Sequence, residues 1–199
     1  MTKWERAAAV VLMVGLVGLG AWTRRADAAE DAGFPGALHS AQRSNDVPEA
    51  EDLYGFLVGS WDMQPIGSTT PRVGGEVHAG RVLEGRALQD VWIWPRRAER
   101  SGAIDRDVNT YGTTLRLWDP GLKAWRVTFL NPLTGRSSEL IGRRSGKDIV
   151  QVGTDSTGTT IRWSFVEIQQ DSFRWIGETL ASDGRTWRVS GDYRATRVR

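Results

Sequence analysis

The chain has 199 residues, a formal net charge of +2 and no cysteine, which excludes disulfide bonds, thiolate catalysis and thiolate metal sites. Residues 1–28 hold four of the 26 basic residues and two of the 24 acidic residues, so the rest of the chain has 22 of each. This balance argues against nucleic acid or an anionic membrane as an electrostatic partner.

The N-terminal 28 residues have the pattern of a secretory signal peptide. Two basic residues precede an apolar stretch at residues 7–22, and Ala26-Asp27-Ala28 is a small-x-small sequence of the kind that signal peptidase accepts. The apolar stretch is shorter than the ~20 residues that usually span a bilayer. We therefore expect an exported protein, periplasmic or extracellular, with no stable membrane insertion after cleavage. Because arginines follow the apolar stretch, an uncleaved N-terminal anchor is the alternative.

Residues 29–46 are rich in glycine, alanine, serine and aspartate and show no periodicity, which indicates a flexible linker. A domain spanning residues 47–199 follows. Asp46-Val47-Pro48-Glu49 resembles a capping box with proline in the first turn. Apolar residues then recur at helical spacing, which predicts a short helix or turn before the first strand: Leu53, Phe56 and Leu57.

The remaining chain consists of short alternating segments separated by turn residues, a pattern typical of an antiparallel sandwich or barrel. Turns such as Asp119-Pro120-Gly121 leave no room for a crossover helix. We therefore predict an all-β fold, a closed antiparallel barrel of about ten strands with a short N-terminal helix. The predicted strands are residues 59–64, 75–83, 87–94, 110–118, 124–131, 137–144, 148–154, 159–168, 172–180 and 186–194.

Eight of the ten tryptophans follow residue 28, and most lie in these alternating segments, which predicts rings inside and arginines outside. In the last hairpin, a three-residue loop with Gly184 left-handed gives one face to the aromatic and apolar side chains. The inward residues are then Phe173, Trp175, Trp187, Val189 and Tyr193. The predicted opposite pairs are Ala181 with Arg185, Glu178 with Arg188, and Arg174 with Asp192.

The predicted barrel combines three features. They are a short helix that enters Gly59-Ser60-Trp61, about ten antiparallel strands, and arginines at the end of the last strand. In this combination the chain resembles the calycins, the superfamily of lipocalins and fatty-acid-binding proteins. There a Gly-x-Trp tryptophan closes one end of the barrel and an arginine of the last strand packs across it. The resemblance implies the first role for Trp61 and the second for Arg194 or Arg197.

Further segments are similar to a bacterial lipocalin-like domain family of unknown function, over roughly residues 50–197. This resemblance implies a lipocalin-like fold and no established substrate. The segments that carry it are Gly75-Glu76-Val77-His78, Leu83-Glu84-Gly85-Arg86-Ala87, Tyr111-Gly112-Thr113-Thr114-Leu115-Arg116 and Arg162-Trp163-Ser164-Phe165.

One group of polar residues is a candidate for chemistry. His78 is the only histidine in the predicted barrel, and Glu76 lies two residues before it on the same strand face. A three-residue turn to the next strand adds Asp90, Trp92 and Trp94 to this face, whereas a two-residue turn removes Asp90. A histidine between carboxylates suits a general base or a polar ligand contact. The alternative is an internal hydrogen-bond network of buried polar groups.

We expect no metal and no cofactor. Zinc needs three or four ligands, for which His78, Glu76 and Asp90 are a marginal set. Haem needs an axial residue such as histidine, and the other histidine, His39, lies in the predicted linker.

The predicted function is the binding of a small, mostly apolar molecule, a lipid or an aromatic compound, in an aromatic-lined cavity. One alternative is a small enzyme of hydratase or isomerase type, with His78 and either Glu76 or Asp90 as catalytic residues. The other is a filled barrel that acts through its surface. The sequence defines neither the ligand nor the oligomeric state. The predicted ligand contacts are Glu76, His78, Asp90, Trp92, Trp163, Trp175 and Trp187.

Overall fold

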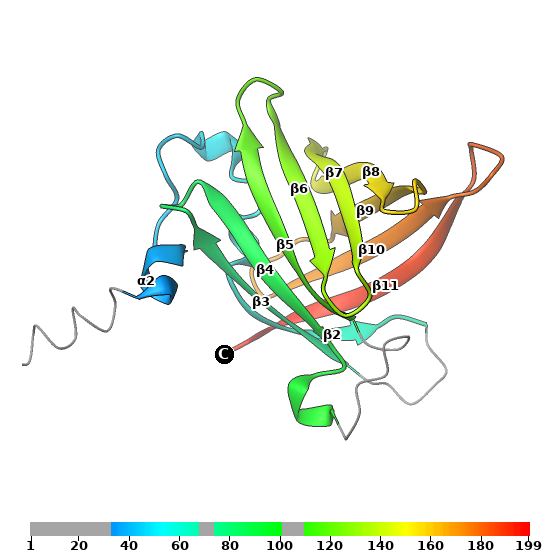
Figure 1. Ribbon diagram of the computed structural model, residues 1–199, viewed down its shortest axis with the longest axis horizontal. Coiled ribbons are helices and arrows are strands. Elements are labelled where there is room, and N and C mark those ends of the chain that lie inside the picture. The colour runs from blue at the N-terminus through cyan, green and yellow to red at the C-terminus, as the bar shows by residue number, and fades with distance from the viewer. Residues whose placement is uncertain (1–32, 68–73, 101–109) are drawn as a thin grey trace, which may run out of the picture. The chain divides into compact units, whose positions relative to one another are not determined.

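The computed structural model describes residues 33–67, 74–100 and 110–199. Its main feature is a closed antiparallel barrel of ten strands, β2 to β11, which confirms the predicted fold class. Each strand pairs with the next one along the chain, and β11 closes the barrel by pairing with β2 (Figure 1). The predicted signal peptide at residues 1–28 lies outside the described residues.

The strands begin and end close to their predicted limits, because alternation and turn residues are local signals. Their bounds are β2 Gly59–Pro65, β3 Gly75–Val82, β4 Ala87–Trp94, β5 Thr110–Asp119, β6 Ala124–Asn131, β7 Arg136–Ser145, β8 Asp148–Asp155, β9 Thr160–Val166, β10 Ser172–Leu180 and β11 Trp187–Val198. Short helical segments are α2 Phe34–Leu38, η1 Glu49–Glu51, η2 Gly55–Leu57 and η3 Arg97–Glu99. Within the described residues, no helix has the length and apolar character needed to cross a membrane.

The described part of the expected linker contains ordered structure. A two-residue strand, β1 (His39–Ser40), pairs with the end of β3, where His39 lies opposite Val82. Farther along, the Ser44 amide donates to the Gly85 carbonyl oxygen. Backbone hydrogen bonding to the barrel strands therefore begins before residue 47, within the expected linker.

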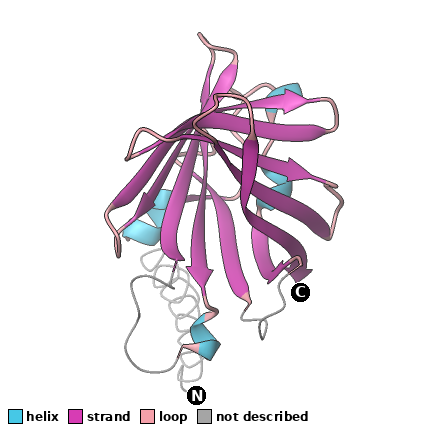
Figure 2. Ribbon diagram, turned by 90° about the vertical axis from the view of Figure 1, so that its right-hand side faces the viewer, coloured by secondary structure: helices cyan, strands magenta, loops and turns pink. Residues whose placement is uncertain are grey.

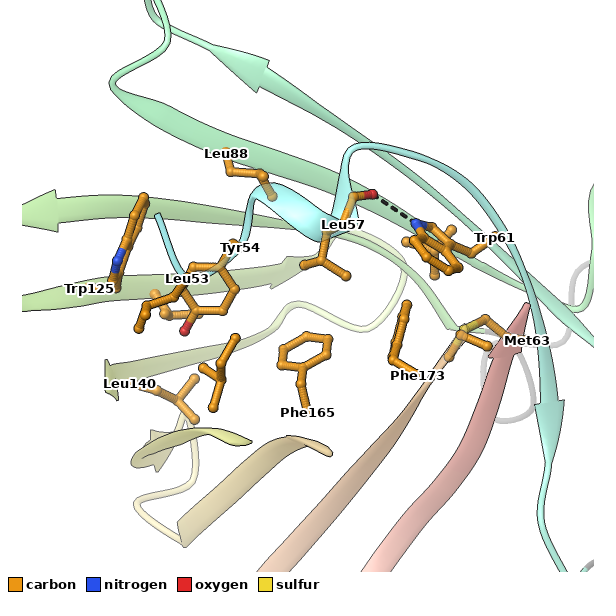
Figure 3. Packing of buried hydrophobic residues seen from close by; sticks show 14 of the residues in the cluster. Leu53, Tyr54, Leu57, Trp61, Met63, Leu88, Trp125, Leu140, Phe165 and Phe173 are labelled. Atoms are coloured by element: carbon orange, nitrogen blue, oxygen red, sulfur yellow. Dashed lines mark hydrogen bonds between the residues drawn. The ribbon is translucent and has the colours of Figure 1, made fainter. Parts of the chain in front are cut away.

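One end of the barrel is filled by the segment that leads into β2. The predicted helix is two 3-10 turns, η1 and η2, and its first turn has no side-chain cap. Leu53, Tyr54 and Leu57 are nearly fully buried and point toward the rings and aliphatic side chains of the opposite strands (Figure 3). These three residues and the buried side chains that they contact belong to one hydrophobic cluster, which forms the core of the barrel.

Two tryptophan side chains of the barrel wall form hydrogen bonds with the backbone of these turns. The Trp61 Nε1–H donates to the Leu57 carbonyl oxygen at 2.8 Å (Figure 3), and the Trp125 Nε1–H donates to the Glu51 carbonyl oxygen at 2.8 Å. Each indole thus satisfies its polar group while its ring is buried.

The predicted register of the last hairpin is wrong. The β10–β11 loop has four residues, 182–185, because Leu180 lies opposite Trp187 and the Ala181 amide donates to Thr186. A bulge at Ser190 then shifts the register between Gly177 and Glu178. The predicted left-handed conformation of Gly184 is confirmed by its φ of 67°.

The bulge divides β11 into two parts that have different registers against β10. Beyond the bulge, Trp175 lies opposite Tyr193 and Phe173 opposite Ala195, so the predicted inward faces are retained. Before it, Thr179 lies opposite Arg188, which contradicts the predicted Glu178–Arg188 pair. Figure 2 shows the strands that form the barrel wall, with the connecting loops at its two ends.

Two of the predicted partners still meet. The Arg174 guanidinium donates to the Asp192 carboxylate at 2.8 and 2.6 Å, although Asp192 lies opposite Ile176 rather than Arg174. Glu178 instead accepts two hydrogen bonds from Arg162 of the neighbouring strand β9, at 2.6 and 2.8 Å.

Candidate functional site

A cavity of about 430 Å³ lies inside the barrel. Its apolar wall consists of six aromatic side chains and one aliphatic residue, drawn from strands β4, β6, β9, β10 and β11: Trp92, Trp94, Phe129, Trp163, Trp175, Tyr193 and Ile161. The barrel is therefore filled around Tyr54, while these rings line a cavity.

The aromatic wall is continuous. Trp175 lies at its centre, with ring centroids 5.4 Å from Trp92, 5.8 Å from Trp163 and 5.7 Å from Tyr193. The wall extends from Trp163 to Phe129 at 5.7 Å and from Tyr193 to Trp94 at 5.0 Å. These separations and tilted planes are those of favourable aromatic pairs.

Glycines on the strands give the rings their positions. A Cβ at Gly177 would lie 2.6 Å from the Trp175 ring, and one at Gly112 would lie 2.6 Å from the Phe129 ring. A Cβ at Gly75 would overlap the Trp94 ring. The rings therefore lie against bare backbone, which leaves space in the barrel interior.

A buried ion pair separates the cavity from the filled end. Arg116 lines the cavity, and its guanidinium donates to the Asp90 carboxylate, with both side chains 1% exposed. The Arg116 Cζ also lies 5.0 Å from the centroid of the Tyr54 ring and 5.7 Å from that of Phe165. Asp90 accepts a further hydrogen bond from the Thr114 amide at 3.2 Å.

Several buried polar atoms near this boundary have no hydrogen-bond partner within the described ranges. They are the Arg116 Nε, the Tyr54 hydroxyl and both side-chain atoms of the Gln151 amide. Burial raises the pKa of the Tyr54 phenol well above its ordinary value, and the nearby Arg116 charge offsets part of this effect. Unpaired buried polar groups are uncommon in folded proteins.

The rest of the cavity lining is polar and includes a second pair of opposite charges, Arg136 and Asp155. The hydrogen bond from the Thr157 hydroxyl is the main cause of a lowered pKa at Asp155, and Arg136 lowers it further. The uncharged polar residues of the lining are Thr114, Ser137, Ser138, Thr179 and Ser190.

The structure brings together only two residues of the predicted group, Glu76 and His78. The turn after β3 has four residues, because Val82 lies opposite Ala87, and this register places Asp90 opposite Ala79. Glu76 and His78 have the opposite parity along β3, so they lie on the outer face while Asp90 lies on the inner one. This separation takes Asp90 out of the predicted group and leaves Glu76 beside His78, with their side chains 3.6 Å apart.

On the outer face, His78 and Glu76 belong to a small polar cluster. The Ser60 Oγ lies 2.9 Å from His78 Nδ1, and an Arg97 nitrogen lies 3.2 Å from His78 Nε2. Glu76 accepts a hydrogen bond from the Arg97 Nε–H at 2.6 Å. Burial opposes ionisation of Glu76, but the hydrogen bonds and charge of Arg97 outweigh it and lower its pKa. His78 therefore makes its polar contacts on the outer face and is not part of the cavity lining.

Three of the four predicted wall tryptophans line the cavity: Trp92, Trp163 and Trp175. Trp187 does not, because the Ser190 bulge turns it to the outer face, where the Arg162 Cζ lies 4.3 Å from its ring centroid. Among the lining residues that the sequence prediction omitted from the ligand contacts are Trp94, Phe129, Tyr193 and Arg116.

At the filled end, Arg197 rather than Arg194 lies over Trp61. Its Cζ is 4.1 Å from the Trp61 ring centroid, and its guanidinium donates to the Val58 and Phe56 carbonyl oxygens at 2.8 and 2.9 Å. Arg194 forms an ion pair with Glu167 at 2.7 Å.

Across the described ranges, no three histidine, cysteine, aspartate or glutamate residues are grouped so as to hold a metal ion. No protein-family model matches the sequence, and none of the curated proteins compared with it matches.

Proposed function

We propose that this protein binds a small, mostly apolar aromatic molecule inside its barrel. The observation that carries the proposal is the cavity of about 430 Å³ with its continuous aromatic wall. Its volume falls in the range of about 300–1,000 Å³ that is usual for sites of small ligands. An apolar wall that also presents polar groups to the ligand is usual for such sites.

Binding is favoured over catalysis by the separation of the polar residues. Asp90 is engaged by Arg116 inside the barrel, whereas His78 and Glu76 contact Ser60 and Arg97 outside it. A general base needs to lie within hydrogen-bonding reach of a bound substrate. Neither His78 nor Glu76 lines the cavity.

The test is a titration of the full chain with N-phenyl-1-naphthylamine, monitored by probe emission and by quenching of tryptophan fluorescence. We expect saturable binding with one site per chain. Trp175→Ala should weaken binding at least about fivefold, because it removes the central ring of the wall and its contact area. Trp187→Ala removes a ring of the same size from the outer face and serves as the matched control, with unchanged affinity.

Two results would count against binding in the cavity. One is the absence of saturable binding to the folded protein. The other is an equal loss of affinity in both tryptophan variants, which would place the probe elsewhere on the chain.

We further propose that the protein acts after export, since the N-terminal sequence resembles a cleavable signal peptide. The intact mass of the protein recovered from the periplasm or medium tests this proposal. A mature chain that begins at Ala29 supports it. A chain that retains Met1 and stays in a membrane fraction would favour an N-terminal anchor instead.

A further inference from the structure

We propose that the ligand of this cavity carries a zwitterionic group at the cavity mouth, the ammonium and carboxylate of an aromatic α-amino acid, and places its ring against the aromatic wall. This inference rests on the proposed function, because it names the class of ligand for the same cavity. Two lining residues of opposite charge carry it, Arg136 and Asp155.

The cavity opens to solvent beside Arg136 and Ser190. These two residues are the exposed members of its lining. Arg136 has the same parity along β7 as the buried Ser138, so it belongs to the inner face of that strand. A charged group of the ligand beside Arg136 therefore stays in contact with water, while the aromatic body of the ligand enters the barrel. This position avoids the large cost of burying a charge.

The guanidinium of Arg136 is available to a ligand. Within residues 33–67, 74–100 and 110–199 its side chain has no hydrogen bond and no ion pair, and the hydrogen bond to the Thr134 hydroxyl comes from its backbone amide. The other arginine of the lining, Arg116, is already paired with Asp90. Arg136 is therefore the lining residue that can pair with a carboxylate of the ligand.

The carboxylate of Asp155 is the counterpart of this cation. Its Oδ1 accepts hydrogen bonds from the Thr157 hydroxyl at 2.6 Å, the Thr157 amide at 2.9 Å and the Thr159 amide at 3.0 Å. The hydrogen bond from the Thr157 hydroxyl is the main cause of its lowered pKa, so Asp155 is ionised at neutral pH. Among the described residues, Oδ2 has no hydrogen-bond donor, and it can accept one from an ammonium group.

The spacing of the two charges selects a zwitterion. Asp155 lies opposite Ser138 and is thus a diagonal neighbour of Arg136, at the roughly 7–8 Å that separates such positions. No ion pair joins Arg136 to Asp155 in the described part of the chain, although the charge of Arg136 still lowers the pKa of Asp155. A zwitterionic group between them gives each charge a partner. A single anion or cation gains one partner and is repelled by the other residue.

The aromatic wall begins next to this pair of charges. Phe129 lies opposite Ser138 on the neighbouring strand β6, and its ring centroid is 5.7 Å from that of Trp163. Trp163 leads on to Trp175 at 5.8 Å. A ring joined to the zwitterionic group by a short chain can therefore contact this wall while both charges stay at the mouth.

The test compares four indoles that share the ring and a two-carbon chain and differ in charge. L-Tryptophan carries both charges, indole-3-propionate the negative one, tryptamine the positive one and 3-ethylindole neither. Equilibrium dialysis against the full chain at neutral pH, with the free compound quantified by chromatography, measures each affinity. We expect L-tryptophan to bind about fivefold more tightly than either singly charged compound, because it gains one more charged contact at a partly exposed site.

Two variants should reverse this preference in opposite directions. Arg136→Met leaves Asp155 alone at the mouth, so tryptamine should bind more tightly than L-tryptophan. Asp155→Asn keeps an oxygen to accept the hydrogen bonds of the turn and removes the charge, so indole-3-propionate should bind more tightly than L-tryptophan. The matched controls are Arg126→Met and Asp119→Asn, which alter an ion pair outside the cavity lining and should keep the preference for L-tryptophan.

The outcomes separate this inference from the proposed function. Equal binding of all four indoles, or tighter binding of a singly charged indole to the unmodified chain, would overturn the inference and leave aromatic binding in place. Failure of all four to bind would overturn both. A purely structural role of Arg136 or Asp155 would weaken all four affinities together and leave their order unchanged, which would also overturn the inference. If a variant does not fold, the four affinities of the unmodified chain still decide it.

Discussion

The hydroxyl group of Tyr54 lies directly against the backbone of Gly142, where the Cβ of any other residue would overlap it. Tyr54 comes from the segment that fills one end of the barrel, and Gly142 lies on β7 opposite Gln151. A residue without a side chain at position 142 is therefore a condition for the burial of Tyr54, which is 0% exposed.

Gly142→Ala should lower the free energy of unfolding by about 1–3 kcal/mol, the usual cost of overpacking a core. Tyr54→Phe removes the overlapping hydroxyl group and should restore most of this loss in the double variant. The single variant Tyr54→Phe should itself change stability by less than about 1 kcal/mol, since the hydroxyl has no hydrogen-bond partner in the described ranges. Urea unfolding of the four proteins measures the cycle, and additive effects would show that the two residues are not coupled.

Trp61 should contribute much more to stability than Trp187. Trp61 is 0% exposed and lies under Arg197, so Trp61→Ala should lower the free energy of unfolding by about 3–5 kcal/mol. Trp187→Ala removes a partly exposed ring that contacts Arg162, and about 1 kcal/mol is expected. The shift of the urea midpoint measures both, and a Trp61→Ala loss below about 1 kcal/mol would refute the role of Trp61 at the filled end.

Strand positions could be predicted because alternation and turn residues are local, but registers could not. The turn at residues 83–86 has Leu83 and Glu84 at positive φ, 54° and 55°, a conformation that non-glycine residues rarely adopt. Nothing in their identity signals it. The residues around Ser190 likewise give no sign of the bulge, although the bulge determines which face of β11 carries Trp187.

The aromatic wall was largely predictable and the polar boundary was not. Trp92, Trp163 and Trp175 follow from apolar alternation within single strands. Arg116 was missed because a charged residue in a strand normally faces solvent. Its signal was parity, since Arg116 shares a strand face with Thr114 and Trp118, which alternate with it along β5.

The turn at residues 182–185 should withstand acid to unusually low pH. The Thr186 hydroxyl and the Thr186 and Arg185 amides donate to Asp183, and these hydrogen bonds lower its pKa to about 2, from an ordinary value of 3.8. Because the folded pKa is depressed, this contribution to stability is fully present above the ordinary pKa and is lost as pH falls through about 2.

An NMR titration of the Asp183 carboxyl carbon tests this expectation. Thr186→Ala removes the strongest donor and should move the pKa of Asp183 back toward its ordinary value, while Ser182→Ala in the same turn serves as the control. A native Asp183 that titrates near 3.8 would show that these hydrogen bonds do not persist in solution.

A substitution on the inner face of the barrel should weaken binding in the cavity, whereas a substitution on the outer face should leave the affinity unchanged. Gly177→Ala places a methyl group 2.6 Å from the Trp175 ring, which should push that ring from the wall into the cavity and weaken binding of N-phenyl-1-naphthylamine by about fivefold or more. His78→Ala should leave this affinity unchanged, because His78 contacts Ser60 and Arg97 on the outer face. Fluorescence titration of both variants, after thermal melts have established that each is folded, makes the comparison. A loss of affinity in His78→Ala with none in Gly177→Ala would place the ligand on the outside of the barrel and reject the cavity as its site.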